Sequence, residues 1–418
     1  MSTSSRRAFL KSAVGSGALA ACFRVGSDLR LPPVSAEEAK VTPRMARLNQ
    51  GIEPLVRLLE ESPRERLVEA VAARIRRGAT YREVLAALLL AGVRNVQPRP
   101  SVGYKFHAVL VVQSLHLTSQ ASAEKDRWLP VFWGLDYFKH AQAQDVREGD
   151  WTMGPVKESG LPSAAKAAEA FERAMGAWDE GAVDVAVAAL ARSAKPEAVF
   201  ELLFRYGARD FRSIGHKAIF AANAHRTLGV IGWQHAEPVL RSLAYAMLQH
   251  EGNNPAKRDA PADVPGRRNQ EASRKIRPDW QSGRPDPTAT TKLLSALRDG
   301  SERDASEQVV KLLNQGAAPA SIWDGLRAGA AELLLRQPGI VSLHAVTTTN
   351  ALHYAWQHSR EDATRRFVLL QNAAFLPMFR EAMRGRGKVA DRRIDGLQPR
   401  VSPDARLEKS VVVAEGNE

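Results

Sequence analysis

Apolar residues recur at every third or fourth position through most of this chain, which is the spacing of one face of an α-helix. The pattern is clear in residues 67–75, 183–191 and 305–313. The strict alternation of β-branched and polar residues that marks a half-buried strand is nearly absent. The sequence therefore predicts an all-α protein.

The helical pattern occurs three times, and each copy contains two histidines separated by eight mostly small or apolar residues. These segments are residues 107–116, 216–225 and 344–353. An apolar segment precedes each of them, and a further helix-like segment follows at a similar distance. A fixed period of this kind indicates a repeat architecture. We therefore predict three pseudo-repeats of about four helices each, packed as hairpins in a helical-repeat or bundle domain.

The predicted boundaries follow from this pattern: repeat 1 at 45–160, repeat 2 at 161–252 and repeat 3 at 291–385. Residues 253–290 are rich in proline and arginine and lack periodicity, which predicts a long loop. Residues 386–418 are predicted to be an irregular tail.

Six of the ten histidines fall on the repeated positions. Nine residues of an ideal helix make two and a half turns, so the two histidines of one pair would point to opposite sides. One pair on a straight helix therefore cannot bind a single ion. Either the leading histidine lies just before its helix begins, or equivalent histidines of different repeats converge on one site.

Imidazole is the commonest neutral metal ligand, and the clustering predicts a metal site. The chain's single cysteine excludes a cysteine-rich zinc site and a conventional iron–sulfur cluster. Iron or copper is favoured and zinc stays open, whereas haem is less favoured and would be non-covalent, because no Cys-x-x-Cys-His occurs. The principal candidate ligands are His107, His116, His216, His225, His344, His353 and His235. The weaker candidates are His140, His250, His358, Asp136 and Glu237. Alternatively, a repeated histidine can donate to a backbone carbonyl and fix a hairpin angle.

The formal charge of +13 does not indicate nucleic-acid binding, because the basic residues are scattered and no recognition motif accompanies them. No apolar run reaches the roughly 18 residues of a membrane span. Contact with a membrane is therefore expected only through an N-terminal lipid.

Residues 5–11, Ser-Arg-Arg-Ala-Phe-Leu-Lys, resemble the twin-arginine signal motif, and a short apolar stretch follows. The resemblance implies a signal peptide at 1–30, passage through the twin-arginine translocase and a periplasmic or extracytoplasmic location. Residues 19–22 look like a lipobox ending at Cys22, which would anchor the protein by a lipid, while residues 18–20 fit an ordinary cleavage site. Both alternatives stay open.

Residues 343–347 together with 351–353 resemble the histidine-rich C-terminal region of the questin oxidase-like family. Those proteins are helical oxygenases that act on polyketide anthraquinones, so the resemblance implies oxidative chemistry. The leading hypothesis is an exported oxidoreductase or oxygenase with a non-haem metal and a small-molecule substrate. A helical-repeat scaffold of the cell envelope and a non-covalent haem protein are the alternatives.

Overall fold

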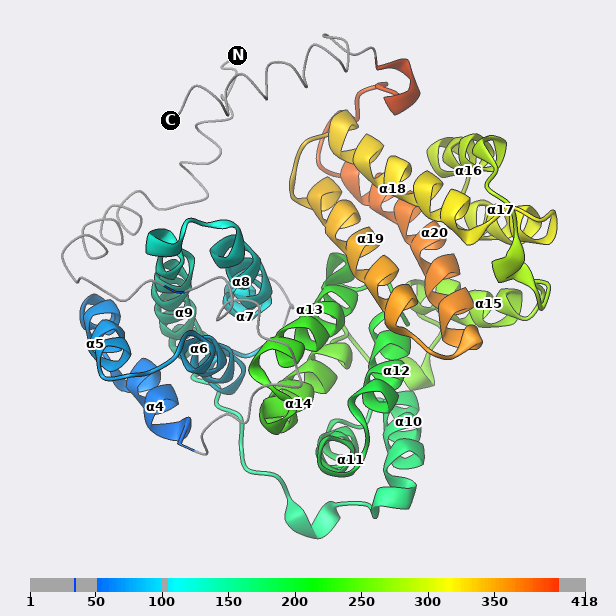
Figure 1. The fold of residues 1–418 in the computed structure, drawn as a ribbon. Coiled ribbons are helices and arrows are strands. Elements are labelled where there is room, and N and C mark those ends of the chain that lie inside the picture. The colour runs from blue at the N-terminus through cyan, green and yellow to red at the C-terminus, as the bar shows by residue number, and fades with distance from the viewer. Residues whose placement is uncertain (1–33, 35–50, 100–103, 398–418) are drawn as a thin grey trace, which may run out of the picture. The chain divides into compact units, whose positions relative to one another are not determined.

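The computed structural model describes residues 34, 51–99 and 104–397 of the 418 (Figure 1). The predicted signal at 1–30, with its lipobox at Cys22, lies outside the described residues, as do residues 398–418 of the predicted tail. The all-α prediction is confirmed, because the described residues form helices and a single isolated bridge between Arg284 and Ala317.

The chain divides into two compact units. The first comprises residues 1–276 and 350–372, and the second comprises 277–349 and 373–418, as far as they are described. The three-repeat organisation is not confirmed. The first unit holds both of the first two predicted repeats and part of the third.

Among the described residues of the first unit, three helices precede the first paired histidines: α4 (Glu53–Glu61), α5 (Arg64–Arg76) and α6 (Tyr81–Asn95). The unit also contains α7 (His107–Leu110), α8 (Val112–Ala121), α9 (Trp128–Glu148), α10 (Ala167–Ala177), α11 (Glu180–Ser193), α12 (Pro196–Gly207), α13 (His216–Ile231), α14 (Ala236–Met247) and α15 (Val264–Ser273), together with residues 350–372 of two later helices. Helix α6 is buried along almost its whole length and packs against α4, α9 and α14. A capping box between Thr80 and Glu83 fixes where α6 begins.

The second unit contains α16 (Pro287–Asp299), α17 (Glu302–Asn314) and α18 (Pro319–Arg336), with α16 packed against both of the others. Arg298 of α16 donates to Glu332 of α18 at 2.6 and 2.8 Å and to Asp395 at 2.9 and 3.0 Å. The backbone N–H of Ile394 also donates to Glu332, at 2.9 Å. The start of the predicted tail is therefore irregular but bonded to this unit.

Two long helices contribute residues to both units, α19 (Ile340–His358) and α20 (Asp362–Arg384). They follow one another in an antiparallel hairpin (Figure 1). Each is assigned as one continuous helix, although α20 contains Pro377.

Helix α15 lies inside the segment that was predicted to be a loop. Its sequence has no apolar stripe, and polar contacts with the first half of α20 hold it instead. Asn269 donates to the Leu370 carbonyl at 3.2 Å and to Gln371 Oε1 at 2.8 Å. Arg366 donates to the Ser273 carbonyl at 3.4 Å and, just after the helix, to the Ile276 carbonyl at 2.5 Å. Hydrophobic periodicity cannot detect a helix that is stabilised in this way. Among the described helices, none is both long enough and apolar enough to cross a bilayer.

The close approach of α15 to the chain at Arg209 gives a first prediction. A Cβ atom at Gly266 would collide with the Arg209 carbonyl oxygen, so Gly266→Ala must displace backbone and should lower the free energy of unfolding by about 2 kcal/mol or more. Gly229, inside α13, has nothing within 4 Å of the same position. Gly229→Ala should therefore raise the free energy of unfolding by about 0.5–1 kcal/mol. Urea denaturation of both variants checks this, and equal effects would contradict the close packing of α15.

Candidate metal centre

Three histidines from distant parts of the chain bring their rings together. His107, His216 and His344 each offer a ring nitrogen, and these three atoms all lie within 4.8 Å of one another. They are the leading members of the three histidine pairs. His216 and His344 are buried, and His107 is half-buried.

Local packing places His107 beside His216. Each is the first residue of its helix, α7 and α13. The preceding Phe106 packs edge-on against Phe220 of α13 with ring centroids 4.9 Å apart. Asn223 of α13 donates to the Leu110 carbonyl at 3.0 Å. The two imidazoles then meet edge to face, with their Nε2 atoms 3.2 Å apart.

That separation suits two ligands of one ion. Metal–imidazole bonds of about 2.0–2.1 Å at a tetrahedral angle put two nitrogen atoms about 3.3 Å apart. The Nε2 atoms of His107 and His216, which share a hydrogen bond in this structure, therefore lie at about the separation of two ligands of one tetrahedral metal.

The backbone fixes which nitrogen of two rings carries the proton. His216 Nδ1 lies 2.5 Å from the Ser213 carbonyl oxygen, and His344 Nδ1 lies 2.6 Å from the Ile340 carbonyl oxygen. A carbonyl only accepts, so each Nδ1 must donate, and the lone pair of the neutral ring is on Nε2. Metal-binding histidines commonly have this arrangement, because the outer bond orients the ring and makes it more basic.

Helix α19 carries the third histidine. Its second half belongs to the first unit, where Arg226 donates to Asn350 Oδ1 at 3.1 Å and stacks over the Tyr354 ring at 3.9 Å. His344 lies six residues before Asn350 on the same helix, in the half that belongs to the second unit.

A left-handed turn precedes His216. Ser213, Ile214 and Gly215 have φ values of 49°, 45° and 83°. This conformation suits glycine but is costly for a β-branched residue such as Ile214, at about 1–3 kcal/mol. Such strain persists only where surrounding contacts impose it.

Those contacts come from Lys217, the residue after His216. Its Nζ donates to both carboxylate oxygens of Asp210, at 2.9 and 3.0 Å, and to the Gln249 carbonyl at 2.9 Å. Ser213 Oγ donates to Gln249 Oε1 at 2.8 Å. Burial lowers the pKa of Lys217 to about 8 against the opposing effect of Asp210. Despite its burial, the pKa of Asp210 is lowered by Lys217 and the neighbouring arginines.

Sequence analysis did not identify Lys217 as a functional residue, although a signal was present. The residues that follow the other two leading histidines are Ala108 and Ala345. A lysine where the other two segments have alanine indicates that a charged side chain is needed at this position.

The second histidines of the pairs do not join the three. His116 is buried in the first unit and bonds through Nδ1 to the Tyr81 hydroxyl at 3.1 Å. His225 bonds in the same way to Tyr354 at 2.7 Å. Burial lowers the pKa of both histidines to about 4 and raises the pKa of Tyr354 to about 12. His353 stacks with Trp356 at 5.7 Å.

The remaining candidates also lie outside this group. His235 is buried at the start of α14, His250 packs edge-on against Trp178, and His140 is exposed on α9. His358 is exposed, stacks on Tyr354 at 3.8 Å and bonds through Nδ1 to the Tyr354 carbonyl. The carboxylates of Asp136 and Glu237 form ion pairs with Arg64 and Arg192.

No family model, curated protein or solved structure matches this chain. The geometry of the site therefore carries the functional argument by itself.

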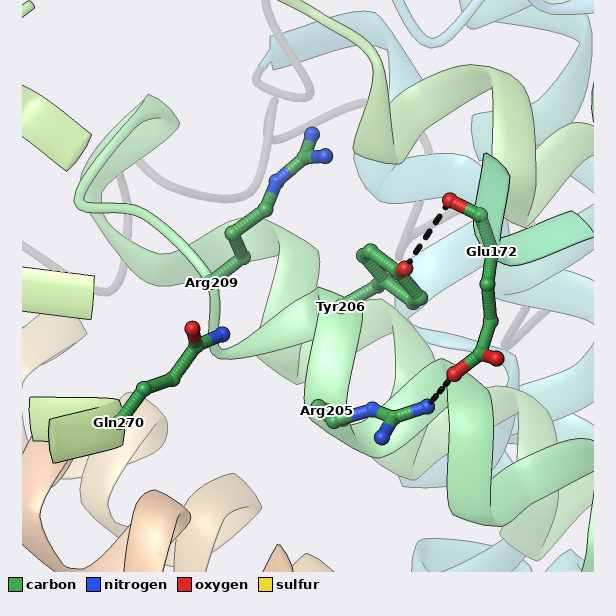
Figure 2. A pocket seen from close by; sticks show the side chains of 5 residues that line it. All are labelled: Glu172, Arg205, Tyr206, Arg209 and Gln270. Carbon is green, nitrogen blue, oxygen red and sulfur yellow. Dashed lines mark hydrogen bonds and ion pairs between the residues drawn. The ribbon is translucent and has the colours of Figure 1, made fainter. Parts of the chain in front are cut away.

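Cavities lie beside the loop that carries Asp210. One, of about 130 Å³, is lined by the polar or charged residues Glu172, Arg205, Tyr206, Arg209 and Gln270. Figure 2 shows the Arg205 guanidinium bonded to the Glu172 carboxylate and the Tyr206 hydroxyl bonded to the Glu172 backbone carbonyl. Another, of about 420 Å³, is lined by Ser213 and Gln249 among others. The second cavity therefore reaches the turn that orients His216, and its size suits a small ligand.

The buried pairing of His116 gives a prediction of pH dependence. The unfolded chain protonates this ring near pH 6.5, whereas the folded chain does so only near pH 4. Lowering the pH between these values therefore favours unfolding, and the stabilisation present above pH 6.5 is lost as the pH falls. Over this range the free energy of unfolding should fall by about 2–3 kcal/mol on account of His116.

Urea denaturation between pH 7 and pH 4 measures this effect. His116→Gln should flatten the pH profile, and His140→Gln, at an exposed position of α9, is the control for replacing a histidine elsewhere. Profiles of equal slope for the wild type and His116→Gln would refute the assignment.

Proposed function

We propose that this protein is an exported metalloenzyme in which His107, His216 and His344 bind one transition-metal ion that serves an oxidation. The convergence of their ring nitrogens within 4.8 Å supports the proposal most directly. Neutral imidazole is a common ligand of transition metals, and the Nδ1 bonds of His216 and His344 to backbone carbonyls make Nε2 the basic nitrogen of each ring. The twin-arginine resemblance at residues 5–11 supports export of the folded, metal-loaded chain.

Three protein ligands suit a reactive metal better than a structural one. Structural zinc sites use four protein ligands, whereas catalytic sites use three and leave a position for water or substrate. An ion held here would supply a Lewis acid or an electron acceptor to a small molecule.

The chemistry of the ligands favours a redox role. Imidazoles are neutral, so they leave the positive charge of the ion uncompensated, whereas thiolates or carboxylates would offset it. A metal in such a site accepts an electron more readily, which suits an oxidant. Imidazole binds iron, copper and zinc, and the oxidative role favours the first two.

A scaffold without chemistry is the second candidate, and the second histidines favour it. His116 and His225 each bond to a tyrosine and join neighbouring helices without serving a metal. If His107, His216 and His344 did the same, the repeated histidines would be structural throughout.

Metal analysis separates the two functions. Protein purified after native export should contain about one transition-metal ion per chain, and His216→Ala should reduce metal affinity by at least about 100-fold. His140→Ala is the matched control and should keep the metal. A visible spectrum recorded on the same sample distinguishes a non-haem ion from haem. Protein that is metal-free, colourless and equally stable after chelation would support the scaffold.

A double-mutant cycle tests whether two of the histidines share one ion. Once either His107→Ala or His216→Ala has removed the metal, the second substitution should add little further loss of affinity. Additive losses would show that the two rings act independently.

A further inference from the structure

Arg82 is a buried arginine with no hydrogen-bond partner among the described residues. It is the second residue of α6 and is 5% exposed, and its Nε and Nη1 atoms are covered and form no hydrogen bond. Other buried arginines of the first unit have partners. Arg241 donates to both oxygens of Asp184 at 2.7 and 2.9 Å, and Arg127 donates to the Val34 carbonyl at 2.7 Å.

An unpaired charge in this position is unstable by itself. A guanidinium keeps its proton under all physiological conditions, so it cannot lower the cost of burial by becoming neutral. Burial lowers the pKa of Arg82, and no carboxylate of the described chain acts against that shift. Removing such a charge from water is compensated only when an opposite charge accompanies it.

His235 lies within electrostatic reach of Arg82. It is 7% exposed, and its buried Nε2 also forms no hydrogen bond. Burial lowers the pKa of His235, and the charge of Arg82 lowers it further. Their helices, α6 and α14, pack against each other.

The first turn of α14 supplies few backbone donors to an anion. The Ala236 N–H already donates to the Trp233 carbonyl, Pro238 has no N–H, and Glu237 places a carboxylate in the same turn. The groups that can face an anion in this part of the first unit are therefore the side chains of Arg82 and His235.

We propose that Arg82 and His235 bind a small monocarboxylate between α6 and α14. The planar guanidinium matches the two oxygens of a carboxylate. A single negative charge balances Arg82, whereas a phosphate dianion would bury a second charge without a partner. This site uses none of the three clustered histidines, so it does not depend on the proposed metal function.

Thermal unfolding of the full chain at pH 7 tests the site, with sodium acetate as the probe and sodium chloride at equal ionic strength as the reference. Acetate should raise the Tm of the wild type by about 2 °C or more, increasing with concentration by mass action. Arg82→Met should abolish this response and, without acetate, should have a higher Tm than the wild type. This variant keeps His107, His216 and His344, so acetate that acted through a metal at those residues would still raise its Tm.

Arg241→Met is the matched control, because Arg241 is a buried arginine of α14 with a carboxylate partner. It should lower the Tm and keep the acetate response. Arg82→Lys, which keeps the charge but loses the planar fork, should fold and respond weakly, so the test stands even if Arg82→Met misfolds. Equal shifts with chloride and acetate would overturn the carboxylate assignment. A wild type without any acetate response would overturn the site.

Discussion

The buried ion pair between Lys217 and Asp210 is the interaction on which the presentation of His216 depends. It ties the start of α13 to the loop before it, and the bond from Lys217 to the Gln249 carbonyl closes the same loop from the other side. The chain between these anchors is left with a left-handed turn that Ile214 would not adopt by preference. That turn brings the Ser213 carbonyl to His216 Nδ1 and so directs the lone pair of the ring toward His107. The strained backbone conformation of this turn therefore fixes the orientation of the His216 side chain.

The spacing within the pairs explains why only half of the repeated histidines gather. Two residues nine apart on a helix point to opposite sides. Once His216 faces His107, His225 must face elsewhere, and it lies among Phe200, Phe204 and Tyr354. The leading position is thereby available for a shared ligand, while the second position serves packing. One repeated motif accordingly has two physical roles.

Periodicity was sufficient to predict the helical class, because most helices bury an apolar face. It was insufficient for α15, which is held by Asn269 and Arg366 rather than by apolar packing. The spacing of the histidines raised convergence as one of two geometries, and the structure places the leading three together, while metal binding itself stays a prediction. Neither Lys217 nor Arg82 was identified, because a charged residue near the start of a helix normally faces water. Their burial is set by tertiary packing, which a local pattern does not encode.

The two proposed sites offer opposite kinds of groups to a ligand. The clustered imidazoles offer ring nitrogens that can donate an electron pair to a cation. Arg82 has donors and no acceptor, so only an anion or another acceptor can satisfy it. The charge of Arg82 would repel a cation that suits the three histidines. A carboxylate that suits Arg82 would find no guanidinium among the three histidines. Selectivity between the two ligands therefore arises from the buried side chains themselves and does not require a difference in the size of the sites.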